Sequence, residues 1–275
     1  ENEEKTRSSS PLRLTYALSA ILAAVVILQA GGGLFIKGLY RDNAWVVSIF
    51  RGTDFVTLAI VVPILIGSLI ATRRGSARAR LILMGMLSFV FYNNIYYLFS
   101  AFNRFFLVYV AVFVLSLSAL IAALVSTEPG RTSMLDPQTH RKPICMSMLA
   151  CAAILAVMWL GQSILYIANG QLPQIIIDTG GITHMVAALD LTLIVPPLVL
   201  GAVWLWQGRP WGHLIATVML VQCTTITVVL TVGAPFQAAA GIKDAWTMVP
   251  LWVLMGVAFF VPLAYTLKNT KTESP

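Results

Sequence analysis

Residues 105–126 read FFLVYVAVFVLSLSALIAALVS, and this stretch decides the class of fold. It carries no charged residue, and a helix of this length, rising 1.5 Å per residue, crosses the roughly 30 Å hydrocarbon core of a bilayer. Lipid offers no hydrogen-bond partner, so the backbone of such a segment must satisfy its own amides, as a helix does. The apolar run is continuous rather than alternating, which favours a helix over a barrel strand.

Seven other stretches share this character, and the composition of the whole chain agrees with them. Hydrophobic residues make up 58% of the 275 positions and charged residues only 11%, whereas a soluble domain has about 25% charged residues. There are too few charges to cover a soluble fold. We therefore predict an all-α membrane protein with about eight transmembrane helices, of which the second is the shortest. The predicted spans are 14–36, 54–72, 81–101, 105–126, 146–168, 185–206, 212–232 and 246–267.

The positions of lysine and arginine predict the orientation in the membrane. Most of the 18 basic residues fall on the side that holds the N-terminus, including Arg73, Arg74, Arg141 and Lys142. Because positive loops stay in the cytoplasm, we place the N-terminus there, and an even number of spans returns the C-terminus to the same side. The net charge of +7 reflects this rule and attraction to anionic lipids. Membrane lipids are the expected partners, and nucleic acid is not.

The two halves of the chain match when it is displaced by 133 positions. Gln29 then meets Gln162 and Pro63 meets Pro196, within a longer series of identities that needs no gap. Each half holds four spans and enters the membrane in the same sense, which predicts a parallel repeat about an axis along the membrane normal. The alternative is a coincidence of apolar composition. The predicted organisation is a polar N-terminal tail 1–13, a first four-helix repeat 14–126, a cytoplasmic linker 127–145, a second four-helix repeat 146–267 and a C-terminal tail 268–275.

The paired prolines predict a local disturbance of two helices. A proline lacks an amide and clashes with the carbonyl four residues earlier, which is that of Ala59 for Pro63 and that of Thr192 for Pro196. The freed carbonyls need partners or water. Such breaks beside polar residues favour an outward-facing cavity, while the alternative is a static kink that only aids packing.

Polar residues inside the predicted spans are candidates for a binding site, because hydrocarbon makes them costly. Asp190 lies about one turn inside the sixth span, and Asp54 opens the second span after Arg51. Asp54 has an alternative role as an N-cap. Gln29 and Gln162 lie in the bodies of paired helices, where they bind a ligand or bond each other across the repeat interface.

The third predicted span carries the densest polar and aromatic group. Asn93, Asn94, Tyr96 and Tyr97 lie in its outer third, and helical spacing places Asn93, Tyr96 and Tyr97 on one face. Tyrosine near a membrane interface is normally an anchor, which is the alternative for Tyr97. The adjacent asparagines are poorly explained by anchoring, so we include all four among the candidate ligand-binding residues.

Catalytic machinery is not apparent. The chain has three cysteines without CxxC spacing and three histidines in loops or at helix ends, and it lacks HExxH, GxSxG and P-loop motifs. We therefore expect no catalytic residues, no metal site and no cofactor.

Several stretches are similar to a group of proteins. Residues 92–99 (YNNIYYLF), 102–105 (FNRF), 51–54 (RGTD) and 209–212 (RPWG) resemble bacterial polytopic membrane proteins for which no activity is established. The resemblance covers most of the chain as a general pattern. It implies the bacterial cytoplasmic membrane and carries over no site residues.

These residues are consistent with three classes of function. The first, which we favour, is a carrier or receptor for a small polar molecule or ion, bound between the halves toward the outer side. The second is a non-catalytic subunit of a larger membrane complex, with a membrane-protein partner or a second copy of the chain packed on faces of small residues. The third, an intramembrane enzyme, has the least support.

Overall fold

The computed structural model describes residues 2–128 and 138–270, and regular structure in these residues is helical throughout. Eight of the helical segments described are long and apolar enough to cross a membrane. They are Leu12–Phe35, Ala44–Arg73, Ala77–Leu98, Phe106–Val125, Arg141–Asn169, Met185–Trp206, Pro210–Ala239 and Val249–Lys268. The predicted number of spans is confirmed, and the chain is a multi-pass membrane protein.

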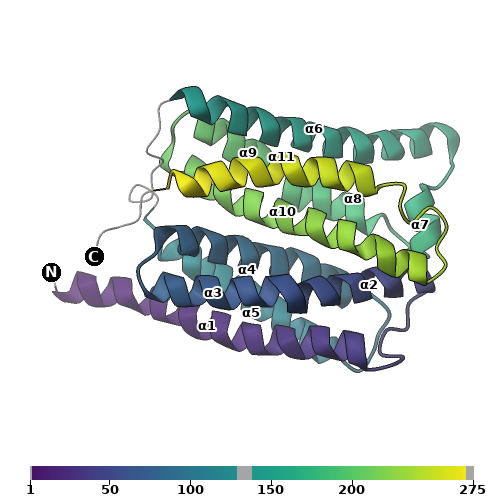
Figure 1. Ribbon diagram of the computed structural model, residues 1–275, viewed down its shortest axis with the longest axis horizontal. Coiled ribbons are helices and arrows are strands. Elements are labelled where there is room, and N and C mark those ends of the chain that lie inside the picture. The colour runs from purple at the N-terminus through teal and green to yellow at the C-terminus, as the bar shows by residue number, and fades with distance from the viewer. Residues whose placement is uncertain (1, 129–137, 271–275) are drawn as a thin grey trace.

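Thirteen elements make up these helices, because some spans are divided (Figure 1). The first set is α1 (Asn2–Phe35), α2 (Ala44–Val56), the π-turn η1 (Thr57–Val61), α3 (Val62–Arg73), α4 (Ala77–Leu98) and α5 (Phe106–Val125). The second set is α6 (Gln138–Asn169), α7 (Gln174–Thr179), α8 (Met185–Leu189), the π-turn η3 (Asp190–Ile194), α9 (Val195–Trp206), α10 (Pro210–Ala239) and α11 (Val249–Lys268).

The helices form two groups that lie side by side (Figure 1). In the first group α1 packs against α3 and α5, and α4 packs against the same two helices. In the second group α6 packs against α9 and α11, and α10 packs against the same two. The groups meet where α10 packs against α2 and α4. These two helices and α10 therefore form the centre of the molecule.

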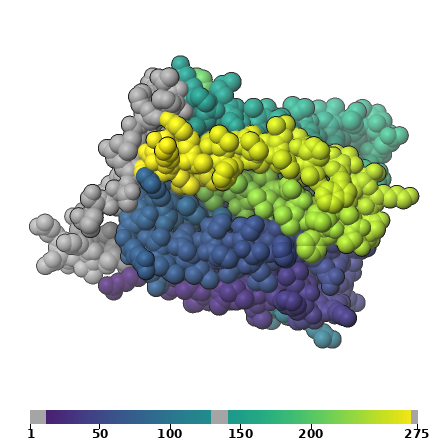
Figure 2. Space-filling view, in the orientation of Figure 1, coloured from purple at the N-terminus to yellow at the C-terminus, as the bar shows by residue number. Residues whose placement is uncertain are grey.

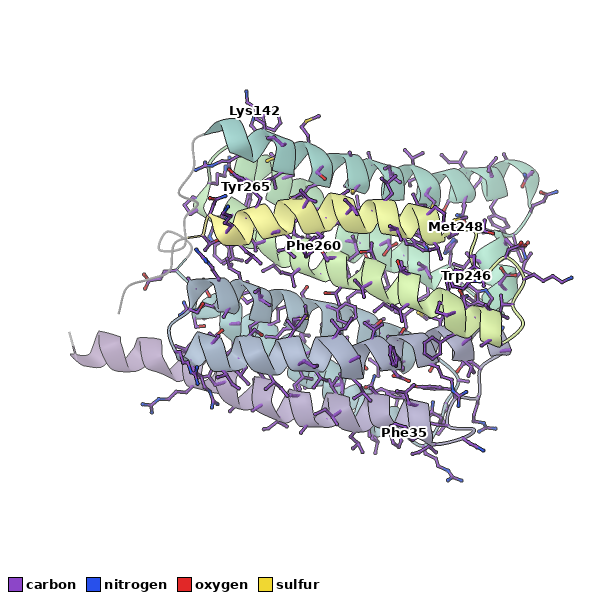
Figure 3. All side chains as sticks on the ribbon, in the orientation of Figure 1. Phe35, Lys142, Trp246, Met248, Phe260 and Tyr265 are labelled. Atoms are coloured by element: carbon purple, nitrogen blue, oxygen red, sulfur yellow. The ribbon has the colours of Figure 1, made fainter. Side chains whose placement is uncertain are left out.

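The start of α1 and the end of α11 lie at one end of the bundle, and the short helix α7 lies at the other (Figure 1). We call the second the α7 end. It is formed by segments 36–43, 99–105, 170–184 and 240–248. In Figure 3 the labelled side chains of Trp246 and Met248 mark the α7 end, and Lys142 and Tyr265 mark the opposite end.

Apolar side chains cover much of the outside. Leu107, Val157 and Ile167 are at least 72% exposed, on helices of both groups. Phe260, which is 57% exposed, belongs to the outer face of α11 (Figure 3). In Figure 2 the side chains of α3 and α11 cover the face turned to the viewer, with α10 between them toward the α7 end. Lipid is the solvent that suits such a surface.

The second span differs from its prediction. Its helix begins at Ala44 and continues to Arg73, so it is among the longest rather than the shortest. Asn43 is the residue that caps it, accepting a hydrogen bond of 3.0 Å from the amide of Val46. Asp54 therefore lies inside the span, and its alternative role as an N-cap is wrong. The run Arg51–Asp54 resembles a loop in sequence. In the structure Arg51 is exposed, and Thr53 and Asp54 are buried within the helix bundle.

A π-turn precedes each of the two paired prolines. The turn η1 ends at Val61, just before Pro63, and η3 ends at Ile194, just before Pro196. The wider π-turn accommodates one extra residue, so it relieves the clash between a proline ring and the carbonyl four residues earlier. The predicted disturbance thus takes the form of a local change in helix winding.

The contact between α4 and α10 generates a test of the packing. A Cβ at Gly85 would overlap the side chain of Val221 and lie 3.1 Å from the carbonyl oxygen of Val218. We expect Gly85→Ala to destabilise the protein by about 1–3 kcal/mol, because a filled contact must move apart. Gly67→Ala is the matched control, since nothing lies within 4 Å of that position and alanine favours a helix. Thermal unfolding in detergent should show a lower midpoint for Gly85→Ala alone; equal midpoints would contradict the packing.

Candidate binding cavity

The carboxylate of Asp190 lies at the centre of a polar cluster between the two helix groups. Asp190 is the first residue of η3 and is 8% exposed. Its Oδ1 accepts a hydrogen bond of 2.5 Å from the hydroxyl of Tyr92 on α4, and its Oδ2 accepts one of 2.8 Å from the indole Nε1 of Trp159 on α6. Three helical segments therefore converge on this one side chain.

The hydrogen-bond directions in this cluster follow from the donors available. The hydroxyls of Tyr92 and Tyr96 lie 2.9 Å apart. Because Tyr92 gives its only proton to Asp190, Tyr96 must donate to Tyr92. The chain of donors runs from Tyr96 through Tyr92 to the carboxylate. The oxygen of Tyr96 keeps a lone pair for another donor.

His184 extends the cluster toward the α7 end. Its Nδ1 accepts a hydrogen bond of 3.2 Å from the amide of Ala187, so this side chain caps α8. An accepting Nδ1 places the ring proton on Nε2, which lies 3.1 Å from Oε1 of Gln162. The imidazole meets the ring of Trp159 edge-on at a centroid distance of 5.1 Å. His184 thus positions both the start of α8 and the indole that binds Asp190.

A cavity of about 1350 Å³ borders this cluster. Its walls come from α2, α4, α6, α7, α8, η3, α10 and α11, so it lies between the two groups. It extends from Asp42 and Gly241 in the segments of the α7 end to Cys223 and Phe259 in the interior. Most of the side chains that line it are apolar or aromatic, so it is less polar than a site for a small polar molecule would require.

A second buried carboxylate, that of Asp54, is satisfied within the first group. Asp54 is 1% exposed. Its Oδ2 accepts a hydrogen bond of 2.6 Å from the hydroxyl of Tyr40, and its Oδ1 accepts one of 2.9 Å from the hydroxyl of Tyr97. The ring of Phe50 stacks on that of Tyr97 at 4.5 Å. Burial, together with the adjacent carboxylate of Asp54, raises the pKa of Tyr40, so this hydroxyl remains a donor.

Glycine is required where α1 passes this second carboxylate. A Cβ at Gly33 would overlap Oδ2 of Asp54 and the hydroxyl of Tyr40, and one at Gly32 would overlap the ring of Phe105. The close approach of a helix to its neighbours explains these glycines.

The residues predicted to bind a ligand separate into three sets. Asp190, Asn93 and Tyr96 line the cavity. Asp54, Tyr97 and Asn94 are buried in the first group, where Asn94 donates a hydrogen bond of 2.6 Å to the carbonyl oxygen of Tyr109. Arg51 is exposed, Gln162 contacts His184, and Gln29 is buried with its Oε1 unpartnered. The described cavity lining contains none of these last six residues.

Three side chains that contribute to the two carboxylate clusters were not predicted from the sequence. Trp159 precedes Gln162 by about one helical turn, so the two side chains share one face of the helix. This spacing could have identified Trp159 from the sequence. His184 stands immediately before the apolar run from Met185, at the position of a cap. Tyr40 lies in a short loop, and its partnership with Asp54 could not be inferred without the fold.

Comparison of the chain with family models, curated proteins and solved structures finds no significant match. The geometry of the cavity is therefore the basis on which a function can be assigned. Among residues 2–128 and 138–270, no group of three His, Cys, Asp or Glu side chains is placed to hold a metal ion.

The cap formed by His184 generates a pH-dependent prediction. Burial lowers the pKa of His184 below its ordinary value of 6.5. As the pH falls below this value, the unfolded chain takes up a proton that the folded chain resists, so stability is present above about pH 6.5 and is lost at lower pH. The proton would also remove the acceptor that caps α8.

We expect His184→Asn to reduce this acid sensitivity, because asparagine caps a helix without titrating. Unfolding midpoints measured at pH 7.5 and pH 5 should differ more for the wild type than for the variant. Other titrating groups act equally on both proteins, so equal differences would show that His184 does not control the stability of this segment.

Proposed function

We propose that this multi-pass membrane protein is a carrier or receptor that binds a small molecule in the cavity beside Asp190. The observation that supports the proposal most strongly is the size and position of the cavity. Its volume of about 1350 Å³ exceeds the roughly 300–1,000 Å³ of typical small-molecule sites. It also lies between helix groups, where membrane carriers bind their cargo.

The arrangement of polar groups supports binding rather than packing alone. A buried carboxylate that served only to hold helices together would be enclosed by its partners, as Asp54 is by Tyr40 and Tyr97. Asp190 instead borders an open volume, although Tyr92 and Trp159 hold it in place. Fixed donors orient the carboxylate, and the cavity leaves room for a ligand to approach it.

We also propose that the two groups are parallel repeats. The turns η1 and η3 begin at Thr57 and Asp190, which are 133 positions apart, and the same displacement relates the bounds of α3 to those of α9. The helices of each group follow the same order of packing. These agreements support the repeat, because a π-turn is rare and one stands at the same register in each half, before Pro63 and before Pro196.

On this proposal the α7 end faces outward from a bacterial cytoplasmic membrane, and both termini face the cytoplasm. Reporter fusions test the orientation. Green fluorescent protein fused after Thr270 should fluoresce, and alkaline phosphatase inserted after Gly241 should be active, because the first requires the cytoplasm and the second requires the outside. The reverse pair of results would invert the orientation, with the cavity opening inward.

Access to the cavity is tested with a thiol that the chain already carries. All three cysteines are free and buried, but Cys223 lines the cavity whereas Cys145 and Cys151 are absent from its described lining. We expect the small neutral reagent N-ethylmaleimide to modify Cys223 in the purified protein and to leave the other two unmodified, as read by peptide mass spectrometry. Failure to modify Cys223, or equal modification of all three, would remove the support for an accessible binding cavity.

Purification separates the proposal from a role as a non-catalytic subunit. A carrier or receptor isolated in mild detergent runs alone or as a homo-oligomer. A subunit co-purifies with a different membrane protein in a fixed ratio.

A further inference from the structure

The charged residues that line the cavity are mostly acidic. In the part of the lining that the structure describes, four aspartates accompany a single lysine: Asp42, Asp178, Asp190 and Asp244 with Lys243. Three of these acids belong to segments at the α7 end, and Asp190 lies deeper. A cavity with low-dielectric walls focuses the field of such charges and concentrates ions of opposite sign. The charge balance therefore favours a cation and disfavours an anion.

One of the acids at the α7 end has an unused acceptor. Oδ1 of Asp42 accepts a hydrogen bond of 2.9 Å from the amide of Ala101, whereas Oδ2 is buried without a partner. A buried oxygen of this kind is costly to leave unsatisfied. A donor arriving from the cavity would remove that cost.

The walls beside the acids are aromatic and aliphatic. Aromatic side chains from four helices line the cavity, and they include Trp45 of α2, Phe89 and Tyr96 of α4, Trp159 of α6, and Trp252 and Phe259 of α11. The faces of such rings attract cations, and desolvation strengthens the attraction. Aromatic walls around a carboxylate suit a charged nitrogen that carries apolar groups.

A bare metal cation fits these walls poorly. Hard cations take six or more oxygen ligands, and no group of three His, Cys, Asp or Glu side chains among the described residues converges on one point. A volume of about 1350 Å³ is also far larger than an ion requires. A sugar or another neutral polar solute would lack partners along the apolar walls.

From these observations we infer that the ligand is an organic cation with a substantial apolar part, and that Asp190 is its counter-charge. This inference rests on the proposed binding function and specifies its ligand. The charged nitrogen lies between Asp190 and the aromatic rings, and the oxygen of Tyr96 offers a further acceptor. The apolar part extends inward toward Leu155, Ile194 and Phe259, which line the interior of the cavity.

Two thiol reagents of similar size and opposite charge test the inference at Cys223. The probes are 2-(trimethylammonium)ethyl methanethiosulfonate, a cation, and 2-sulfonatoethyl methanethiosulfonate, an anion. Each modification rate at Cys223 is divided by the rate of the same reagent with a free thiol in the same buffer, which removes the difference in intrinsic reactivity. We expect the cation to react at least about tenfold faster after this correction.

Matched variants identify the source of the preference. Asp190→Asn should lower the corrected ratio toward one, and Asp42→Asn should lower it in part. Asp54→Asn is the control, because it removes the same charge from a carboxylate outside the described lining of the cavity and should leave the ratio unchanged. If Asp190→Asn does not purify as a folded protein, the wild-type ratio and Asp42→Asn still decide the sign of the preference.

The outcomes separate the two proposals. If Cys223 reacts with N-ethylmaleimide but shows no preference for the cation, the cavity is accessible and the inferred ligand class is wrong. A preference for the anion would overturn it equally. If Asp54→Asn lowers the ratio as much as Asp190→Asn, the preference reflects total charge rather than Asp190. If Cys223 reacts with no reagent, the binding function itself fails.

Discussion

Hydrocarbon provides no partner for a polar group, and this constraint shapes the interior of the molecule. Two aspartates lie inside the bundle, and each is satisfied by side-chain donors from other segments. The helix α4 supplies a donor to both, since Tyr92 binds Asp190 and Tyr97 binds Asp54. Successive residues of a helix point about 100° apart, so one short stretch of α4 faces both groups. The central position of α4 therefore follows from these two hydrogen bonds as much as from apolar packing.

The two carboxylates have different surroundings, and the difference lies in what fills the space beside them. In the first group the loop residue Tyr40 and the ring of Phe50 occupy that space, and Gly33 lets α1 approach closely. Beside Asp190 the corresponding volume is a cavity. The first arrangement is a closed structural unit, whereas the second depends on α7, on His184 and on the segment between α10 and α11 for its outer boundary.

The sequence predicted the spans well because the relevant signal is local. A continuous apolar run must be a helix in lipid wherever the other helices lie. The prediction placed the start of the second span too late, because the sequence of Arg51–Asp54 resembles a loop. Asp54 is stable inside the helix only because tyrosines from distant segments donate hydrogen bonds to it.

The same limit applies to the prediction of the site, which also depends on contacts between distant segments. Asp190 and Tyr96 could be chosen for their cost in hydrocarbon, but the bond from Trp159 joins residues whose proximity depends on how α6 meets η3. Tyr97 was grouped with Asn93 by helical spacing and Asn94 was included as its neighbour, yet both turn toward the first group, because α4 has helices on both sides.

The π-turns have a consequence for how the chain tolerates changes in its length. Each turn holds one residue more than a regular helix would, and its wider winding absorbs that residue, so the segments on either side keep the relative direction of a regular helix one residue shorter. If residues Thr57 to Val61 wound as a regular helix with no residue lost, Asp54 would rotate by about 100° about the helix axis. The carboxylate would then point away from Tyr40 and Tyr97. Deletion of one residue from the turn would instead restore regular winding with Asp54 in its present direction. The irregular winding is therefore what directs the buried acid toward its partners at the present chain length.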